Sequence, residues 1–267
     1  MERADPKTFA KHWRWEQDRD GLAWLTFDNV ARHNALTMAM YASLTEALAR
    51  AESDPSVRVV LFEAEGDAFS AGNDLGDFAA VASGKVSREE MTTFTFLGQL
   101  AKARKPYVAA VQGLAVGIGV TMLLHCDLVF VAENAKLSTP FVNLALVPEA
   151  ASSVLLPARI GHARAFAMFA LGEPIDGRTA ANIGLANAAL PADEVGPKAL
   201  AAAKLLATKP IGSLQATKQL MRDGAAIAAI MARESDIFAT RLKSPETAEA
   251  LKAFAERRPP DFSKFTS

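Results

Sequence analysis

A single carboxylate stands in a largely apolar stretch of the chain, NLALVPEAASSVLLPARIG, which runs from Asn143 to Gly161. Glu149 follows a proline and precedes two alanines. A carboxylate among apolar groups is costly to ionise, and burial raises its pKa towards the range of a general base. The residues alone leave two readings open, a solvated turn residue after Pro148 or the working group of an active site.

Two glycine-bearing segments are candidates for presenting backbone N–H groups to a ligand. The first, DAFSAGNDLGDF (67–78), has a small-small-Gly run that lets a ligand approach the backbone closely. The second, GLAVGIGVTMLL (113–124), precedes a predicted helix, whose free N–H groups and positive dipole end suit an oxyanion. Simpler readings remain open for both: a turn that needs Gly72, and close packing of a helix against a strand.

Several other kinds of site are not indicated by the sequence. The second glycine segment does not match the dinucleotide-binding motif G-x-G-x-x-G, because the third glycine of that motif would fall on Met122. It also lacks the phosphate-binding lysine of a P-loop. No G-x-S-x-G nucleophile motif occurs. The single cysteine, Cys126, excludes an intrachain disulfide, and scattered histidines predict no metal site. These histidines, expected on the surface or in packing roles, are His12, His33, His125 and His162.

Composition narrows the classes of partner. The chain has 267 residues, half of them hydrophobic, with 29 basic and 30 acidic side chains and a formal net charge of -1. The sequence has no basic patch, so it does not predict a nucleic-acid partner. The charged N-terminus lacks an apolar signal-peptide core, which favours a cytoplasmic location. The apolar run 108–132 is interrupted by Gln112, His125 and Asp127, and therefore predicts a buried strand, turn and helix rather than a membrane span.

The elements that must position these residues alternate along the chain. Predicted strands cover 21–29, 57–66 and 105–113, with a further strand and loop over 128–140. Helices are expected over 37–54, with Thr37 as N-cap, over 87–104, opened by a capping box of Ser87 with Glu90, and over 119–127. This alternation predicts an α/β core of stacked ββα or βαβ units. Strand signals stop after about Pro191, so we expect a core over 1–195 and a C-terminal helical region over 196–267.

Taken in order and spacing, four segments resemble the crotonase, or enoyl-CoA hydratase/isomerase, superfamily: ARHNAL, FSAGNDL, KPYVAAVQGLAVGIG and HCDLVFVAENAKLSTPFVNLALVPEAAS. The resemblance extends from about Leu22 to the end of the chain. It implies a spiral of ββα units and a C-terminal helical trimerisation region, in a homotrimer or dimer of trimers. It also implies an acyl-CoA thioester substrate, a place in fatty acid metabolism such as β-oxidation, and no cofactor apart from the coenzyme A of the substrate.

The resemblance also implies the site residues. In that family two backbone N–H groups hold the thioester oxygen, and motif matching puts them on Asn73 and Ile118. Both lie in the glycine segments already singled out. The expected substrate-binding residues are Ala71, Gly72, Asn73, Asp74, Leu75 and Phe141. The nearby acids Asp74 and Asp77 are expected to be loop caps or surface groups, and Asp127 to be structural.

Departures from the hydratase pattern favour one branch of that superfamily. The two glutamates that position water in hydratases fall on Thr121 and Phe141, so neither is acidic here. Glu149 remains, and its position resembles the Δ3,Δ2-enoyl-CoA isomerases of the peroxisomal type, in which a single glutamate moves a proton. Apolar neighbours such as Leu146 and Val147 should raise its pKa. The alternatives are an enoyl-CoA hydratase, another acyl-CoA-processing member, and a non-catalytic acyl-CoA-binding protein.

Overall fold

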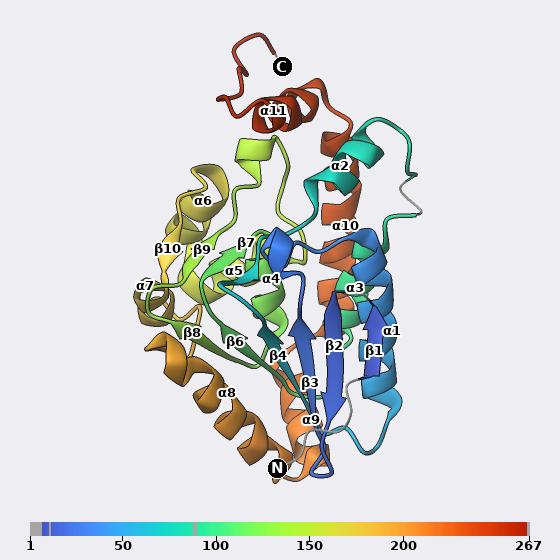
Figure 1. Ribbon diagram of the computed structural model, residues 1–267, viewed down its shortest axis with the longest axis vertical. Helices are drawn as coiled ribbons and strands as arrows, with labels where there is room; N and C mark the ends of the chain where they lie inside the picture. Colours follow the sequence, from blue (N-terminus) through green and yellow to red (C-terminus); the bar gives the residue numbers. More distant parts are fainter. Residues whose placement is uncertain (1–6, 11, 88–89, 266–267) are drawn as a thin grey trace.

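The computed structural model describes residues 7–10, 12–87 and 90–265, which form two sheets surrounded by helices (Figure 1). The larger sheet has the order β1-β2-β3-β4-β6-β8-β11, and its strands from β3 onward are parallel. The smaller sheet has the order β10-β9-β7-β5. The strands are β1 (Lys7–Ala10), β2 (Trp13–Gln17), β3 (Leu22–Phe27), β4 (Val59–Ala64), β5 (Ala68–Ser70), β6 (Tyr107–Val111), β7 (Leu114–Val116), β8 (Leu128–Ala132), β9 (Lys136–Ser138), β10 (Ile175–Asp176) and β11 (Ala188–Leu190).

Helices follow the strands and dominate the C-terminal third. The α-helices are α1 (Met38–Ser53), α2 (Leu75–Ala82), α3 (Thr92–Ala101), α4 (Ile118–Thr121), α5 (Ser152–Ile160), α6 (His162–Ala170), α7 (Gly177–Asn182), α8 (Ala192–Ala207), α9 (Ile211–Met221), α10 (Gly224–Leu242) and α11 (Pro245–Ala255). The short 3-10 helices within the described residues are η1 (Val30–Arg32), η2 (Met122–His125) and η3 (Val142–Leu144).

From β4 to β9, successive strands alternate between the two sheets, which makes this part of the fold a spiral. The pairs β4–β5, β6–β7 and β8–β9 each put one strand in the larger sheet and the next in the smaller one, before a helical segment. All residues of β3 and β6 are buried, as expected for parallel strands covered on both faces. The turn between β6 and β7 requires Gly113, because a Cβ there would lie 1.7 Å from the carbonyl oxygen of Asp67. The predicted α/β class and ββα spiral are confirmed.

The spiral brings the two glycine segments to one edge of the smaller sheet. Strands β5 and β7 are parallel neighbours, with Ala68 opposite Leu114 and Ser70 opposite Ala115. The chain therefore leaves both strands at the same edge, as ligand-binding segments do at the carboxyl ends of parallel strands. The segment after β5 leads into α2, and the segment after β7 leads into α4.

Most predicted elements are present, and one helix begins later than expected. Thr37 caps α1 by accepting a hydrogen bond from the N–H of Met40. The helix predicted from Ser87 begins at Thr92 instead, although the N–H of Ser87 does donate to the Glu90 carboxylate. Residues 88 and 89 of that prediction lie outside the described residues. The Ser87–Glu90 hydrogen bond therefore precedes α3 and does not belong to its first turn.

The C-terminal helices pack against the spiral in different places. Helix α8 lies along β4, β6 and β8 of the larger sheet, and the predicted boundary at residue 195 falls inside it. Helix α11 lies at the other end of the molecule, in contact with α2 and η3 (Figure 1). The apolar run 108–132 forms β6, β7, α4, η2 and β8, as buried elements. Across the described ranges, no helix has the length and apolarity needed to cross a membrane.

Candidate active site

The two glycine segments touch backbone to backbone. A Cβ added to Gly72, which has φ of +90°, would lie 2.8 Å from the carbonyl oxygen of Val116. A Cβ on Gly119 would lie 2.8 Å from the carbonyl oxygen of Ser70. These separations exclude any side chain, so glycine is required at both positions. Close packing thus explains the glycines, and it also fixes the Asn73 and Ile118 segments against each other.

Backbone hydrogen bonding leaves the N–H groups of Asn73 and Ile118 available. The bonds from Leu36 N to Gly72 O (2.8 Å) and from Asp74 N to Leu36 O (2.9 Å) engage the residues on either side of Asn73. Ile118 is the first residue of α4, where an N–H has no partner within its own helix. In the described part of the chain, neither N–H donates to a protein acceptor. Two backbone donors without a protein acceptor, on adjacent segments, are the kind of groups from which an oxyanion hole is built.

A cavity of about 50 Å³ is lined by Asn73 and by Gly117, the residue before Ile118. Five of the predicted substrate-binding residues line it: Ala71, Gly72, Asn73, Leu75 and Phe141. The other lining residues are mostly apolar and come from several elements: Phe78, Val116, Gly117, Pro140, Leu144, Leu146 and Phe238. The predicted residue Asp74 is not among them; its carboxylate accepts from the N–H of Gly76 and pairs with Arg32 over 2.6 Å. The cavity is therefore a small, mainly apolar space, and Ile118 itself is not among its lining residues.

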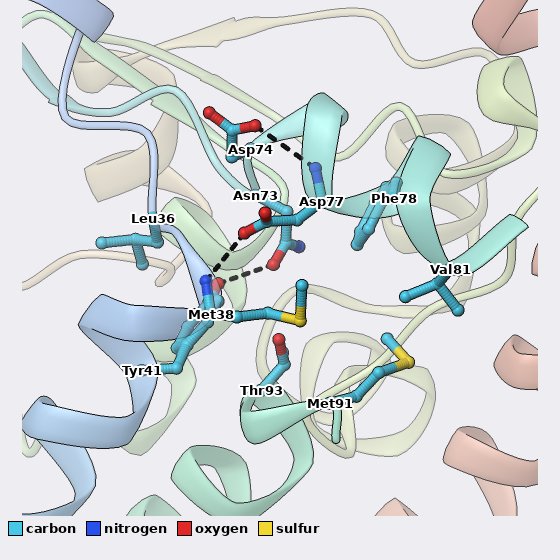
Figure 2. A pocket seen from close by; sticks show the side chains of 10 residues that line it. All are labelled: Leu36, Met38, Tyr41, Asn73, Asp74, Asp77, Phe78, Val81, Met91 and Thr93. Atoms are coloured by element: carbon cyan, nitrogen blue, oxygen red, sulfur yellow. Dashed lines mark hydrogen bonds between the residues drawn. The ribbon is translucent and has the colours of Figure 1, made fainter. Parts of the chain in front are cut away.

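Asn73 also lines a second, smaller pocket (Figure 2). The phenol of Tyr41 donates to Oδ1 of Asn73 over 2.7 Å, which fixes the orientation of the Asn73 side chain. The carboxylate of Asp77 accepts from the N–H of Met38 over 2.7 Å and so ties α2 to the start of α1. Asp77 and Asp74 both cap helices, as predicted. The remaining lining is mainly apolar: Leu36, Met38, Phe78, Val81 and Met91.

Glu149 is buried, which rules out its reading as a solvated turn residue. The residue is 3% exposed and precedes the turn into α5. Oε1 accepts a hydrogen bond from the Thr121 hydroxyl over 2.5 Å, while Oε2 has no partner among the described residues. Burial raises the pKa of Glu149 to about 8; the Thr121 bond opposes this shift and the negative charge of Glu234 adds to it. The carboxyl group is thus a base of unusual strength for a glutamate.

Helix α4 connects Glu149 with the proposed oxyanion donors. Ile118 is the first residue of that helix and Thr121 is its last, one turn later. Glu149 does not line the cavity itself, but its Oε1 is held by Thr121. Tyr41 also lies within electrostatic reach of Glu149, whose charge contributes to raising the tyrosine's pKa after the larger effect of burial. A base, two backbone donors and an apolar cavity are therefore assembled around one short helix.

The sequence did not indicate that Tyr41 and Glu234 lie near Glu149, or that His125 bonds to the adjacent Ala150. Glu234 is 6% exposed and accepts hydrogen bonds from the backbone just after Glu149. A signal for it was present, because Glu234 occupies the buried stripe of α10 at helical spacing from Met231 and Phe238. An acid in an apolar stripe requires buried partners.

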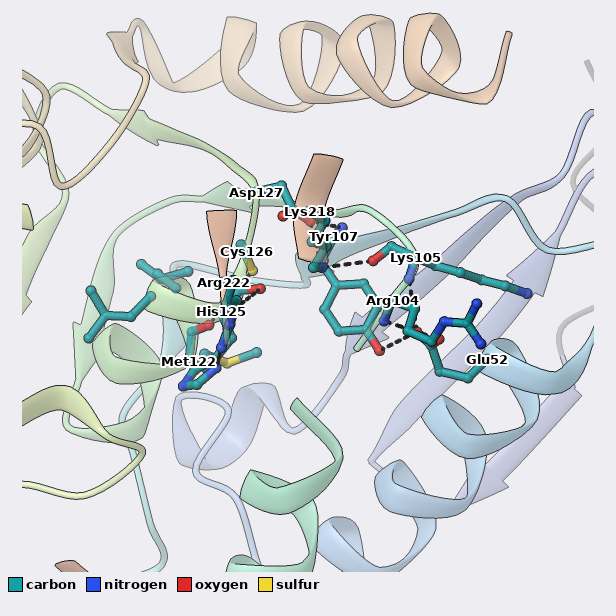
Figure 3. A network of polar contacts seen from close by, with 12 residues as sticks. Glu52, Arg104, Lys105, Tyr107, Met122, His125, Cys126, Asp127, Lys218 and Arg222 are labelled. Carbon is teal, nitrogen blue, oxygen red and sulfur yellow. Dashed lines mark hydrogen bonds and ion pairs between the residues drawn. The ribbon is translucent and has the colours of Figure 1, made fainter. Parts of the chain in front are cut away.

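Other charged residues form a structural network away from the cavity (Figure 3). Asp127 accepts from the N–H of Tyr107 and from Lys218, each over 2.8 Å, which confirms its predicted structural role. From the sequence alone, Lys105 is predicted to be a solvated surface residue. That expectation is wrong: Lys105 is 4% exposed and its ammonium donates to the carbonyl oxygens of Ala51 and Asp54.

Known proteins similar to this chain share its fold over most of its length. A family model described as enoyl-CoA hydratase/isomerase matches residues 17–265. The enoyl-CoA hydratase ACTT3 of Alternaria alternata is 33% identical over 252 residues, covering 92% of this chain and 84% of that protein. Enoyl-CoA delta isomerase 2 of Rattus norvegicus is 31% identical over 244 residues, covering 90% of this chain but only 62% of that protein. The crystal structure of an enoyl-CoA hydratase/isomerase from Pseudoalteromonas atlantica T6c superposes with a TM-score of 0.88 at 36% identity, covering 94% of this chain and 100% of that one.

Proposed function

The chain belongs to the enoyl-CoA hydratase/isomerase family, and from that membership we propose that it shifts the double bond of a 3-enoyl-CoA to the 2-position. One observation carries this choice within the family. Thr121, at the position of a hydratase glutamate, is a neutral hydroxyl that donates to Glu149, the acid with an unpartnered buried oxygen. One carboxylate with a free oxygen, and no acid at Thr121 or Phe141, suits proton transfer better than addition of water.

The reaction needs a single carboxylate. Glu149 takes a proton from C2 of the 3-enoyl thioester, and the electron pair of that C–H bond moves into a dienolate with negative charge on the thioester oxygen. The protonated carboxyl then returns the proton to C4, the double bond settles between C2 and C3, and Glu149 is again a carboxylate. No proton is gained or lost overall, so no second acid or co-reactant is required.

The backbone N–H groups of Asn73 and Ile118 would hold the oxygen that becomes negative. Because neither donates within the described protein, both are available to a thioester oxygen. Loss of one such donor raises the barrier by roughly 2.7–4 kcal/mol in known cases. Since the donors are backbone groups, the positions of these residues matter more than their side chains.

Burial of Glu149 supports the same chemistry. Removing the carboxylate from water raises its pKa to about 8, and so brings its basicity closer to that needed to remove a C2 proton. Apolar walls contributed by Phe141 and Leu146 limit access of water to the dienolate.

Hydration of a 2-enoyl-CoA is the second candidate, because relatives such as ACTT3 of Alternaria alternata are named hydratases. Glu234 is a second carboxylate in the neighbourhood, but three donors from Ala151 and Ser153 occupy it. A water-adding role would require Glu234 to give up those bonds. We also propose, on the family resemblance alone, a homotrimer or dimer of trimers, a cytoplasmic location and no cofactor beyond the substrate's coenzyme A.

The test is a comparison of two substrates with the purified protein. We expect 3-hexenoyl-CoA to be converted to the conjugated 2-enoyl thioester. The conversion is monitored by the rise in ultraviolet absorbance of the product. We expect crotonyl-CoA to be hydrated at least about 100-fold more slowly, given the usual contribution of a general acid–base group. Faster hydration than isomerisation would identify a hydratase, and binding of both thioesters without turnover would identify a non-catalytic acyl-CoA-binding protein.

A further inference from the structure

The turn that follows Glu149 has a backbone conformation that must be held by its surroundings. Ala150 and Ala151 have φ of 62° and 56°, in the left-handed region that residues with a Cβ adopt at a cost. Two such residues in succession, directly before α5, set the direction in which the chain carries the Glu149 side chain. The groups that hold this turn therefore control where the carboxylate lies.

Glu234 holds one side of the turn. Oε2 of Glu234 accepts from the N–H of Ala151 over 2.6 Å, and Oε1 accepts from the N–H of Ser153 over 3.0 Å and from the Ser153 hydroxyl. All three partners are donors, so they match the ionised form of the acid. The contacts cap the start of α5, which has no side-chain cap of its own. A buried acid on α10 thus reaches across more than 80 residues of sequence to the turn beside Glu149.

His125 holds the other side. Its ring nitrogen Nε2 lies 2.8 Å from the carbonyl oxygen of Ala150, and because a carbonyl only accepts, Nε2 carries the proton. The other ring nitrogen, Nδ1, then accepts from the guanidinium of Arg222, as drawn in Figure 3. Burial, reinforced by Arg222, lowers the pKa of His125 to about 3, which keeps the ring neutral. The turn is therefore hydrogen-bonded at Ala150 to a neutral histidine and at Ala151 to a carboxylate.

We propose that Glu234 is a positioning residue that fixes the Ala150–Ala151 turn opposite His125, and so sets both the location of the Glu149 carboxyl group and the electrostatic field around it. This inference rests on the proposed function of Glu149 as the base. Two effects follow from one side chain: its hydrogen bonds orient the turn, and its negative charge opposes ionisation of Glu149. Among the described residues, the ionisable groups around this region include Tyr41 on α1, His125 on η2 with Arg222 against its ring, and Glu234 on α10.

Two variants separate these effects. Glu234→Gln keeps the length but removes the charge, and its amide group cannot accept from both Ala151 and Ser153. Glu234→Asp keeps the charge on a side chain one methylene shorter, so it cannot keep all the contacts at their present lengths. Asp236→Asn, an exposed acid on the same helix, is the matched control for a loss of negative charge. Circular dichroism and thermal unfolding of each variant establish that it is folded.

The first readout is the ionisation of Glu149 itself, which infrared spectroscopy monitors through the carboxyl band during a pH titration. The Glu149→Gln variant is used to assign that band. The titration midpoint is expected to fall by about one pH unit in Glu234→Gln, because a nearby negative charge has been removed. It should stay at the wild-type value in Glu234→Asp and Asp236→Asn. An unchanged midpoint in folded Glu234→Gln would overturn the electrostatic part of the proposal, since a merely structural role leaves that midpoint in place.

The second readout is turnover of 3-hexenoyl-CoA. We expect kcat to fall roughly 10- to 100-fold in both Glu234 variants with KM nearly unchanged, because a small misplacement of the base slows proton transfer without weakening binding. Wild-type kcat in folded Glu234→Asp would overturn the positioning role, and this variant decides that part if Glu234→Gln does not fold. A wild-type protein inactive on 3-hexenoyl-CoA would contradict the proposed function instead, and the infrared titration would still test the influence of Glu234 on Glu149.

Discussion

The Thr121 hydroxyl donates a hydrogen bond to Oε1 of Glu149 over 2.5 Å, inside the protein and away from solvent. Thr121 is the last residue of α4, the helix that begins with the proposed oxyanion donor Ile118. One four-residue helix therefore holds both the proposed base and one of the proposed oxyanion donors. The arrangement makes the distance between base and oxyanion hole a property of the fold rather than of flexible side chains.

Thr121→Val tests this link with a substitution of nearly equal volume. The Thr121 bond lowers the pKa of Glu149, so its loss should raise that pKa further and release the carboxyl group. We expect kcat/KM for 3-hexenoyl-CoA at neutral pH to fall about 10-fold, in keeping with one lost hydrogen bond to a charged group. Thr139→Val is the matched control, because the Thr139 hydroxyl is buried without a partner among the described residues. That control should keep its activity and gain stability; equal losses in both variants would argue against the link.

The rate should depend on pH through Glu149. The carboxyl group must be ionised to accept a proton, and its pKa is about 8. We therefore expect kcat/KM to rise about tenfold per pH unit on the acid side and to level off above that pKa. Steady-state kinetics from about pH 5 to about pH 10 measure the midpoint. A plateau that already begins near pH 5 would mean that Glu149 ionises like an exposed glutamate.

The stability of the wild-type protein should fall as pH rises, whereas its activity should rise. The pKa of Glu149 is about 8 in the folded protein and 4.5 in a model compound, so between these values the folded state binds the extra proton. Stability is then fully present below about 4.5 and declines as pH rises through 8, by an amount on the order of 2–5 kcal/mol. Glu149→Gln removes this dependence, so its advantage in Tm over the wild type should grow from acid to alkaline pH. An advantage that shrinks as pH rises would contradict the burial of an ionisable Glu149.

Gly119→Ala tests the contact between the two glycine segments. The added Cβ would meet the carbonyl oxygen of Ser70 at 2.8 Å, and this backbone oxygen cannot rotate away. We expect a loss of about 1–3 kcal/mol in unfolding free energy and a fall in kcat, because α4 must shift away from β5. Gly196→Ala in α8 is the control: nothing lies within 4 Å of its Cβ, so it should gain up to about 1 kcal/mol at full activity. Gly119→Ala with unaltered kcat would show that the spacing of the segments is not critical.

The sequence predicted those features that depend on local pattern. Alternating apolar strands and capped helices give the α/β spiral, because each element buries the face that its periodicity defines. The acid in the apolar run and the two glycine segments were recognisable as anomalies in composition. The start of α3 at Thr92 was not recognisable from the sequence. The Ser87–Glu90 pair matches a capping-box pattern, although α3 begins only at Thr92.

Contacts between distant parts of the chain were beyond local reasoning. The partners of Glu149 come from α4, α1 and α10, and only the folded spiral brings them together. Lys105 illustrates the same limit, because a lysine beside an arginine reads as a surface residue until the carbonyl groups that surround it are known. Residues that act through tertiary contacts carry only weak signals, such as Glu234 in the buried stripe of α10.

The most direct measurement is turnover of 3-hexenoyl-CoA by Glu149→Gln beside the wild type, at saturating substrate and at a pH above the pKa of Glu149. Gln keeps the volume and the acceptor for Thr121 but cannot take the C2 proton. We predict a kcat lower by about 10²- to 10⁴-fold, the usual contribution of a positioned general base, with substrate binding largely retained. Wild-type turnover in a folded Glu149→Gln variant would contradict the assignment of Glu149 as the proton carrier.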